Sequence, residues 1–247
     1  MTFNNIRIVL VATSHPGNIG SVARAMKTMG LHRLYLVSPH LFPDWRADEL
    51  AAGADDILKA ATVTHSLQSA LAGCHLALAT SARPRDIALP GLTPSEGALL
   101  VRDSSDETEI AIVFGREHAG LTNEELLCCH YHLHIPSSPE FSSLNLAQAV
   151  QIVAYEIRMK RLSPVANVKM QTKDQLATVE DVEQFYEHLK RVLIDIDFLK
   201  PSNPKKLMQR LRCLFNRAHL LQLEVNILRG MLSNIDAVLK KQANRDE

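Results

Sequence analysis

The feature that most constrains the fold is an alternation, over the first two thirds of the chain, between short apolar runs and helical patterns. Ile6–Ala12 is almost continuously apolar, as expected of a strand buried on both faces. Asn18–Met29 follows with apolar residues at helical spacing, with Asn18 as the candidate N-cap and Gly30 as the stop. Such alternation builds parallel sheets, so we predict an α/β fold with a mostly parallel sheet and helices on both faces.

The same alternation continues to about residue 161. We predict further strands at Leu34–Val37, Thr62–Val63, Leu76–Ala79, Ile110–Phe114 and His132–Ile135. We predict further helices at Arg46–Ala52, Ser66–Leu71, Ser95–Val101, Thr122–Leu127 and Leu144–Arg161.

The pattern changes after residue 162. The next segment loses periodicity and opens with Ser163-Pro164, which predicts a linker. Beyond it the patterns are helical only: one helix with Thr178 as N-cap, one beginning at Asn203-Pro204, and one over residues 220–239. We therefore predict a domain at 1–162, a linker at 163–177 and a small all-α domain at 178–247.

Charge is distributed unevenly. The 247 residues include 27 Lys+Arg and 27 Asp+Glu, and this zero balance argues against a generic polycation. Residues 1–160 hold 12 basic and 16 acidic residues, net −4, whereas residues 161–247 hold 15 and 11, net +4. From Lys200 to Leu223 there are six basic side chains and no acid, which favours an RNA-facing surface over a merely solvated helix face. The residues predicted to contact RNA there are Lys205, Lys206 and Arg210.

Other sequence features bear on the compartment. No apolar run approaches 18 residues, and the N-terminus lacks the pattern of a signal peptide, so we expect no membrane partner. The four cysteines show no Cys-x-x-Cys spacing, and the adjacent pair Cys128-Cys129 suits a disulfide poorly. We expect reduced thiols and a cytoplasmic location.

Four loops rich in glycine, proline and small polar residues directly follow predicted strands, at 13–20, 80–86, 115–121 and 136–145. In an open parallel sheet, ligands bind beyond the carboxyl ends of the strands, so we expect the site there. Gly17 and Gly20 do not match a dinucleotide-binding fingerprint, and no Gly-Lys-Ser/Thr follows. Arg83 and Arg85, in one of these loops, are candidate phosphate contacts.

Two other patterns have competing interpretations. His130, His132 and His134 alternate as zinc ligands on a strand can, but an alternating polar face explains them equally well, and we predict no metal. Ser14-His15 could indicate a hydrolytic nucleophile, which the lack of a Gly-x-Ser-x-Gly elbow disfavours.

Three segments resemble, in order, the motifs of the knotted SPOUT methyltransferases of the TrmH type. The segment from Asn18 to Arg24 resembles the first motif, Val113–Leu121 the second, and Ile135-Pro136 with Ser143–Ala149 the third. The resemblance spans nearly all of residues 6–161. The context of the first two motifs and the helical extension resemble more specifically the bacterial tRNA (cytidine/uridine-2′-O)-methyltransferases, which modify the anticodon loop.

The resemblance implies a trefoil knot at the C-terminal end of the sheet domain, a homodimer with a shared active site, and tRNA as the macromolecular partner. It also implies S-adenosylmethionine as cofactor and S-adenosylhomocysteine as product. The implied cofactor-binding residues are Thr80, Ser81, Ala82, Gly115, Ile135, Ser142, Ser143 and Leu144. The implied catalytic residues are Arg24, Ser143 and Asn145, with Asn18 and Glu117 contacting the RNA. Glu117 has an alternative interpretation as a cap or an ion-pair partner of Arg116.

The activity implied is methylation of the ribose 2′-OH of a cytidine or uridine at position 32 of the anticodon loop. Alternatives are another tRNA or ribosomal RNA nucleotide, or a non-catalytic RNA-binding member of the fold. In-line transfer of a methyl group needs positioning rather than a metal. Arg24 has two candidate roles: a base deprotonated by its surroundings, or a clamp that orients the hydroxyl while solvent takes the proton. A free guanidinium is a poor base, since its pKa exceeds about 12.

Overall fold

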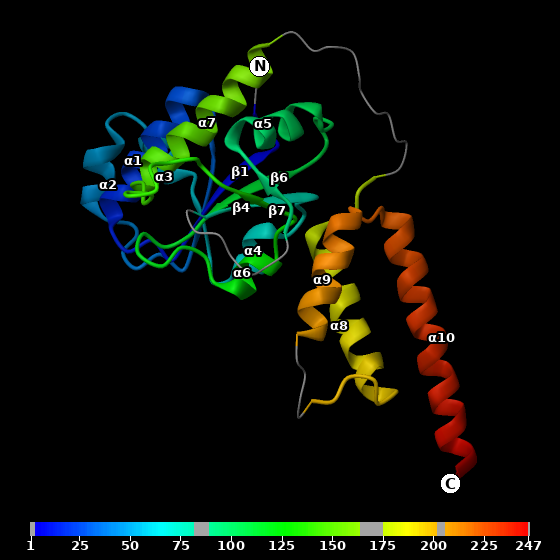
Figure 1. Ribbon diagram of the computed structural model, residues 1–247. Helices are drawn as coiled ribbons and strands as arrows, with labels where there is room; N and C mark the ends of the chain where they lie inside the picture. The colour runs from blue at the N-terminus through cyan, green and yellow to red at the C-terminus, as the bar shows by residue number, and fades with distance from the viewer. Residues whose placement is uncertain (1–2, 82–88, 164–174, 202–205, 247) are drawn as a thin grey trace.

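The computed structural model describes residues 3–81, 89–163, 175–201 and 206–246. Its strands form one seven-stranded sheet in the order β3-β2-β1-β6-β4-β7-β5, and every pairing is parallel (Figure 1). The strands are β1 (Ile6–Val11), β2 (Arg33–Val37), β3 (Thr62–Thr64), β4 (Leu76–Thr80), β5 (Gly91–Leu92), β6 (Ile110–Phe114) and β7 (Tyr131–Leu133). The predicted α/β class with a parallel sheet is confirmed; the chain crossing of a knot stays a prediction.

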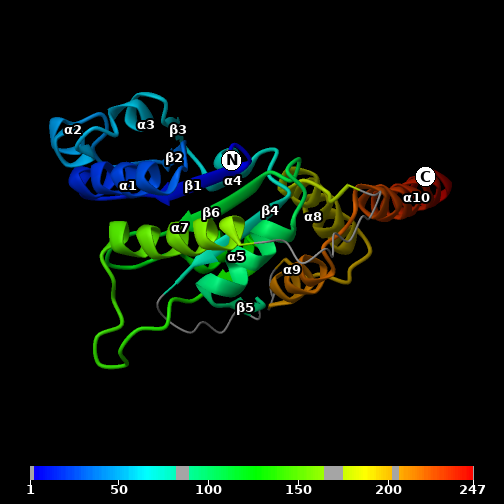
Figure 2. The ribbon, with the colours of Figure 1, turned by 90° about the horizontal axis from the view of Figure 1, so that it is seen from above.

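Helices cover both faces of this sheet (Figure 2). They are α1 (Pro16–Met29), α2 (Trp45–Ala51), α3 (Asp55–Lys59), α4 (Leu67–Leu71), α5 (Pro94–Asp103), α6 (Asn123–Leu127) and α7 (Leu146–Leu162). The central strand β1 is buried along its whole length, with Ile8 and Leu10 in the core under α1, α5 and α7, and Val9 and Val11 in the core under α4 and α6. This is the reason for its continuous apolar run, because every second side chain faces the opposite layer.

The start of α1 differs from the prediction. Its N-cap is His15, whose Nδ1 accepts a hydrogen bond from the Gly17 backbone nitrogen, and Pro16 occupies the first turn. Proline suits this position because its missing N–H has no partner in a helix anyway. The prediction of Asn18 as the cap is therefore wrong, and its side chain is available for contacts elsewhere.

Two short elements, α3 and β5, were not predicted, because five and two residues carry too little periodicity to be recognised. The histidine-rich strand was also placed wrongly. β7 covers only Tyr131–Leu133, so His130 and His134 flank the strand instead of sharing one face of it with His132.

Three helices form a separate group beside the sheet, visible in both ribbon views (Figures 1 and 2). They are α8 (Val179–Asp195), α9 (Leu207–Ala218) and α10 (Gln222–Asp246), with their own core around Phe185, Tyr186 and Val225. Thr178 caps α8 as predicted. The predicted start of the second helix at Asn203-Pro204 lies outside the described residues. The domain boundaries at 162 and 178 stay a prediction, and residues 175–177 already contact the helical group, since the Ala177 nitrogen donates to the Leu220 carbonyl.

The helical group docks on the amino ends of β4 and β7. The buried Asn216 of α9 donates to the Leu127 and Cys129 carbonyls and accepts from the Tyr186 hydroxyl. The residue that ends α9, His219, stacks on the Tyr131 ring and bonds its hydroxyl at 2.8 Å. Parallel strands have their carboxyl ends at the opposite edge, so this contact lies away from the loops predicted to form the site.

Among the described residues, no helix combines the length and the apolar character needed to cross a membrane.

Candidate active site

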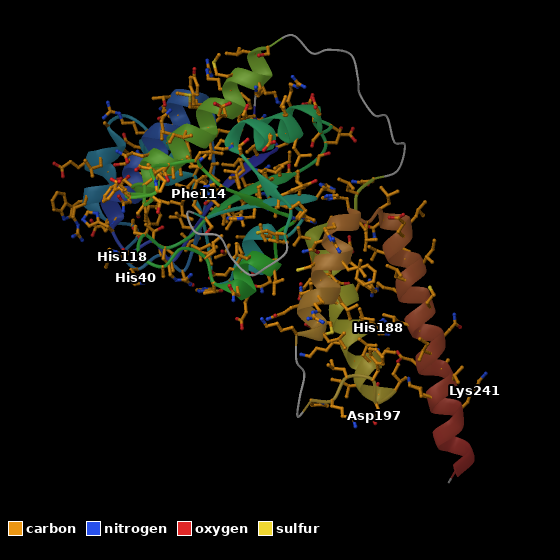
Figure 3. All side chains as sticks on the ribbon, viewed as in Figure 1. His40, Phe114, His118, His188, Asp197 and Lys241 are labelled. Atoms are coloured by element: carbon orange, nitrogen blue, oxygen red, sulfur yellow. The ribbon has the colours of Figure 1, made fainter. Side chains whose placement is uncertain are left out.

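A pocket lies at the carboxyl ends of β4, β6 and β7, where the sequence predicted a site. Phe114 and His118, which both line it, lie far from the helical group in Figure 3. The pocket contains seven of the eight residues predicted to bind the cofactor: Thr80, Ser81, Gly115, Ile135, Ser142, Ser143 and Leu144. The eighth, Ala82, lies outside the described residues. Three loops far apart in the sequence thus meet in one hollow.

The loop after β6 doubles back sharply at Gly115. Arg116 and Gly120 exchange backbone hydrogen bonds across this turn. A Cβ placed on Gly115 would lie 2.2 Å from the Gly120 carbonyl carbon, so no other residue fits without moving the backbone. Gly120 itself has a φ of 68°, in the left-handed region that favours glycine. The two glycines shape the wall of the pocket.

Glu117 lies at the tip of this loop and accepts four hydrogen bonds from the first-motif loop. Its Oε2 accepts from the Ser14 nitrogen at 3.1 Å and the Ser14 hydroxyl at 2.9 Å. Its Oε1 accepts from the His15 nitrogen at 3.3 Å and from Asn18 Nδ2 at 2.9 Å. Burial alone would raise the pKa of Glu117, but the hydrogen bonds from Asn18 and Ser14 outweigh it and lower the pKa to about 2. Glu117 is therefore a charged anchor for the first-motif loop.

The third motif joins the same network through Asn145. Its Oδ1 accepts from the Ala147 nitrogen and so caps α7, while its Nδ2 donates to Asn18 Oδ1 at 3.2 Å. Asn18 thereby contacts both Glu117 and Asn145. One hydrogen-bonded chain links all three motifs at the rim of the pocket.

The alternative interpretation of Glu117 as an ion-pair partner of Arg116 is wrong. Arg116 forms a bidentate ion pair with Glu125: its two terminal nitrogens lie 2.8 and 2.9 Å from the two carboxylate oxygens. Glu125 also completes a capping box with Thr122 at the start of α6, which holds the far side of the same loop.

The three predicted catalytic residues are placed differently. Ser143 is exposed and lines the pocket, and Asn145 is exposed beside it on the rim. Arg24 lies on α1, with an exposed side chain that belongs neither to the pocket lining nor to any hydrogen bond or ion pair within the described parts of the chain. One copy of the chain therefore brings Ser143 and Asn145 together but leaves Arg24 open to solvent.

The basic residues of the helical group fall into two classes. Lys206, Arg210 and Arg217 are exposed and, at spacings of four and seven residues, share one face at the start and along the length of α9. Arg212 points the other way, pairs with Glu183 and lies over the Tyr186 ring at 4.5 Å. Lys205, Arg83 and Arg85 lie outside the described residues.

The three histidines of residues 130–134 lie in different surroundings: His130 lies at the docking contact, whereas His134 Nδ1 is 3.3 Å from the Ser81 carbonyl oxygen near the pocket. His130 is buried, accepts a hydrogen bond from the Ala77 nitrogen through Nδ1, and stacks near His219 at 5.9 Å. Burial, with a smaller effect from His219, lowers the pKa of His130 to about 4. Within the ranges that the structure describes, no three His, Cys, Asp or Glu side chains are grouped as metal ligands are.

Sequence reasoning missed the roles of Ser14 and His15 in holding the rim. The signal was present for His15, because Pro16 is a typical first helical residue and points to its predecessor as the cap. No local pattern reveals that Ser14 contacts Glu117, about a hundred positions further along the chain.

Comparison with known proteins agrees with this geometry. Residues 5–155 match the SpoU rRNA Methylase family, and residues 180–247 match the C-terminal domain of the tRNA methyltransferase TrmJ. The tRNA (cytidine/uridine-2′-O-)-methyltransferase TrmJ of Photorhabdus laumondii is 51% identical over 96% of this chain and 99% of its own. The tRNA (cytidine/uridine/adenosine-2′-O-)-methyltransferase TrmJ of Pseudomonas aeruginosa is 50% identical, over 96% of each chain.

A solved structure extends the likeness to three dimensions. TrmJ from Z. mobilis ZM4 superimposes with a TM-score of 0.83 at 34% identity, covering 93% of this chain and 98% of its own. Sequence, fold and the three linked motif loops lead to the same conclusion. The chain belongs to the SpoU methylase family, in the branch of the TrmJ methyltransferases.

Proposed function

We propose that the chain methylates the ribose 2′-OH of a cytidine or uridine in the anticodon loop of tRNA, at position 32, with S-adenosylmethionine as methyl donor. The observation that carries the proposal is the hydrogen-bonded chain from Glu117 through Asn18 to Asn145, which fastens three motif loops around one pocket. The names of the relatives that are 50% and 51% identical support the tRNA substrate and the 2′-O position.

The pocket suits such a cofactor chemically. Leu133, Ile135, Leu144 and Leu146 line the pocket with apolar surface on which an adenine ring would pack, and Thr80, Ser81, Ser142 and Ser143 line it with small polar side chains. The bound cofactor supplies an electrophilic methyl group on a sulfonium and is converted to S-adenosylhomocysteine. The residues that would hold it are Thr80, Ser81, Ala82, Gly115, Ile135 and Ser142–Leu144.

The residues of the chain must then place the ribose hydroxyl in line with the methyl group and allow its proton to leave. Ser143 and Asn145 orient the hydroxyl from the rim, where both are exposed. Arg24 acts as a clamp on the RNA phosphate and orients the hydroxyl, while solvent takes the proton. The side chain of Arg24 is exposed in one copy of the chain, so its guanidinium is free to meet an RNA phosphate.

The proposed active form is a homodimer. The outer face of α7 carries an exposed apolar row, Tyr155, Met159 and Leu162, at spacings of four and three residues. α7 packs against α1, the helix of Arg24, so a partner covering this row also approaches Arg24. This supports a site completed by the second protomer.

The proposed tRNA contacts include the exposed face of α9 formed by Lys206, Arg210 and Arg217. Lys205, Arg83, Arg85, Asn18 and Glu117 complete the proposed RNA-binding set. For Glu117 we propose an indirect contribution, because four hydrogen bonds already occupy its carboxylate. The proposed compartment is the cytoplasm, which the four free cysteines support.

The test is transfer of a tritiated methyl group to total tRNA, followed by mapping of ribose methylation. We expect incorporation at position 32 and its loss in Arg24→Ala, with the exposed Lys59→Ala as matched control. Methylation of another nucleotide would support the alternative target, and no incorporation into any RNA would support a non-catalytic RNA-binding role. Retained activity with a shifted pH profile in Arg24→Lys would contradict the clamp.

A further inference from the structure

Four exposed histidines lie at the carboxyl ends of four neighbouring strands. β3, β2, β1 and β6 are side by side in the sheet and run parallel. The loop after each of them carries one exposed histidine, and we call the set the histidine row: His65, His40, His15 and His118. Strands in a sheet are about 4.8 Å apart, so three spacings give the row a length of roughly 14 Å. Figure 3 shows His40 and His118 on the same side of the sheet domain, away from the helical group.

Hydrogen bonds between the loops fix the order of the row. The His40 nitrogen donates to the Thr13 carbonyl at 3.1 Å, which joins the loops after β2 and β1. The Ser38 hydroxyl donates to the His65 carbonyl at 3.1 Å, which joins the loops after β2 and β3. Glu117 joins the loops after β1 and β6 through the network described above. The last histidine of the row lines the pocket, so the row continues the rim of the pocket toward β3.

The row presents N–H donors to solvent. An imidazole carries at least one N–H group in either protonation state. In His15, Nδ1 accepts a hydrogen bond from the Gly17 nitrogen at 3.1 Å, so a neutral ring has its hydrogen on Nε2. This Nε2 is therefore a donor, and the side chain that carries it is exposed.

The carboxylates near the row are used within the protein. Two acidic residues, Asp44 and Glu117, belong to the loops that carry the row, which are residues 13–15, 38–44, 65–66 and 115–121. Both oxygens of Asp44 bind the Arg46 guanidinium, at 2.8 and 2.9 Å, and Glu117 accepts four hydrogen bonds. An anion that approaches the row therefore meets donors, while the nearby acids already have partners.

The spacing of the row suits an extended ligand better than a single ion. Among the residues whose positions are described, no three His, Cys, Asp or Glu side chains are grouped closely enough to hold a metal ion. A nucleic-acid strand carries one phosphate per nucleotide and advances about 3.4 Å for each, so roughly four stacked nucleotides match the length of the row. Phosphate oxygens accept hydrogen bonds from N–H groups of this kind.

We propose that the histidine row binds the phosphate backbone of the RNA strand that adjoins the methylated nucleotide. This inference rests on the proposed function, because the RNA that enters the pocket is a polyanion and the row begins at the pocket. The row is separate from the basic face of α9, since α9 docks at the amino ends of the strands. Because phosphates carry no sequence information, the row holds the strand without selecting the base.

Chemical footprinting tests the row in the unaltered full-length chain. Diethyl pyrocarbonate acylates accessible imidazole rings, and mass spectrometry measures the acylated fraction at each histidine. Excess tRNA should protect the four histidines of the row and leave the control His32 as reactive as before, because this exposed residue precedes β2 at the other edge of the sheet. If tRNA is retained with the protein on a filter while the row stays reactive, the proposal is overturned. If no tRNA is retained at all, the proposed function fails as well.

Substitution measures the contribution of the row to binding. His40→Ala/His65→Ala, at two positions outside the pocket lining, should weaken tRNA binding roughly tenfold, because two hydrogen bonds to phosphate are lost. Methyl transfer at saturating tRNA should keep the parent kcat. His40→Arg/His65→Arg restores the donors and should bind tRNA at least as tightly as the parent chain, and His32→Ala is the matched control. Parent affinity in the alanine variant, or weakened binding in the arginine variant as well, would contradict the row.

Light scattering without RNA distinguishes the strand from a second copy of the chain. His40→Ala/His65→Ala should have the same mass as the parent chain at the same concentration. A lower mass would show that the row contacts a second copy, and would overturn its assignment to RNA.

Discussion

The rim of the pocket and the docking contact of the helical group are both built from hydrogen-bonded polar residues, but those at the rim are at least partly exposed and those in the docking contact are buried. At the rim, Glu117 is hydrogen-bonded but only partly buried, and Ser143 and Asn145 are exposed. In the docking contact, Asn216 and His130 are 5% and 7% exposed; Asn216 makes three hydrogen bonds within the protein, and His130 Nδ1 accepts one from the Ala77 nitrogen. Polar groups that are linked but open can meet a substrate, whereas those that are linked and enclosed hold two parts of a chain together.

Acid should separate the two regions most clearly. Burial, with His219 nearby, lowers the pKa of His130 from 6.5 to about 4, and burial also lowers the pKa values of His219 and His75. Because the pKa of His130 is lower in the folded protein, its neutral ring contributes fully to the free energy of docking above pH 6.5. This contribution is lost as the pH falls toward 4, by up to about 3 kcal/mol. Glu117 stabilises the rim above pH 4.5 and loses this effect only as the pH falls toward 2.

Hydrogen exchange at pH 7.5 and 5 measures this difference. Amides of α9 should exchange faster at pH 5, after correction for the intrinsic rate, while those of the first turn of α7, which Asn145 caps at the rim, should not. His130→Gln/His219→Gln should flatten the response of α9, and the exposed His65→Gln should leave it unchanged. An equal acid response in α9 and in the first turn of α7 would remove the distinction.

Asn216→Ala should destabilise the docking contact by about 2 to 3 kcal/mol, because it leaves the Leu127 and Cys129 carbonyls without their partner and the Tyr186 hydroxyl with the Arg212 carbonyl alone. Urea unfolding measures the change, with the exposed Asn226→Ala as matched control. Methyl transfer to a short anticodon stem-loop should be unaffected, since the pocket lies at the other edge of the sheet. Loss of this activity together with stability would show that the regions are not independent.

Glu117→Gln should lower kcat roughly thirtyfold, which corresponds to a rise of about 2 kcal/mol in the activation free energy. The reason is that an amide replaces the charged acceptor of four hydrogen bonds. A residue that positions the loop should change kcat more than the KM for tRNA. Glu124→Gln, at an exposed site on α6, should leave both constants unchanged. A change confined to KM would instead indicate direct contact with the RNA.

Lys206→Ala/Arg210→Ala/Arg217→Ala should weaken tRNA binding about tenfold at low salt and reduce the salt slope by about three. The exposed Lys59→Ala on α3 is the control. Unchanged affinity and slope would mean that the basic face of α9 is only solvated. Binding measured by filter retention over a salt series distinguishes these outcomes.

The elements that the sequence predicted well are those whose pattern is repeated or buried. β6 matches its predicted bounds because Ile110–Phe114 is enclosed on both faces, and α8 begins after Thr178 because its capping chemistry is local. The loops that line the pocket were predicted from motifs whose order along the chain is specific. In each case neighbouring residues carry the information.

Partners distant in the sequence were not predictable in the same way. Glu117 contacts Ser14 and Asn18 only because β1 and β6 pair in parallel and bring their following loops together. His130 is the first of three alternating histidines, a pattern that also fits an exposed polar face. It is buried because the end of α9 covers it, and no pattern within residues 130–134 could indicate this. The choice between partners is therefore made by tertiary packing.

The pocket and the docking contact lie at opposite ends of the parallel strands, so the length of the strands sets the distance between them. α9 docks at the amino ends of β4 and β7, and the pocket opens at their carboxyl ends. The five residues of β4 span about 16 Å, which is the least distance between the two surfaces within one protomer. An RNA fragment shorter than this cannot contact both. An RNA that reaches both surfaces must therefore extend around the side of the protomer over at least this distance.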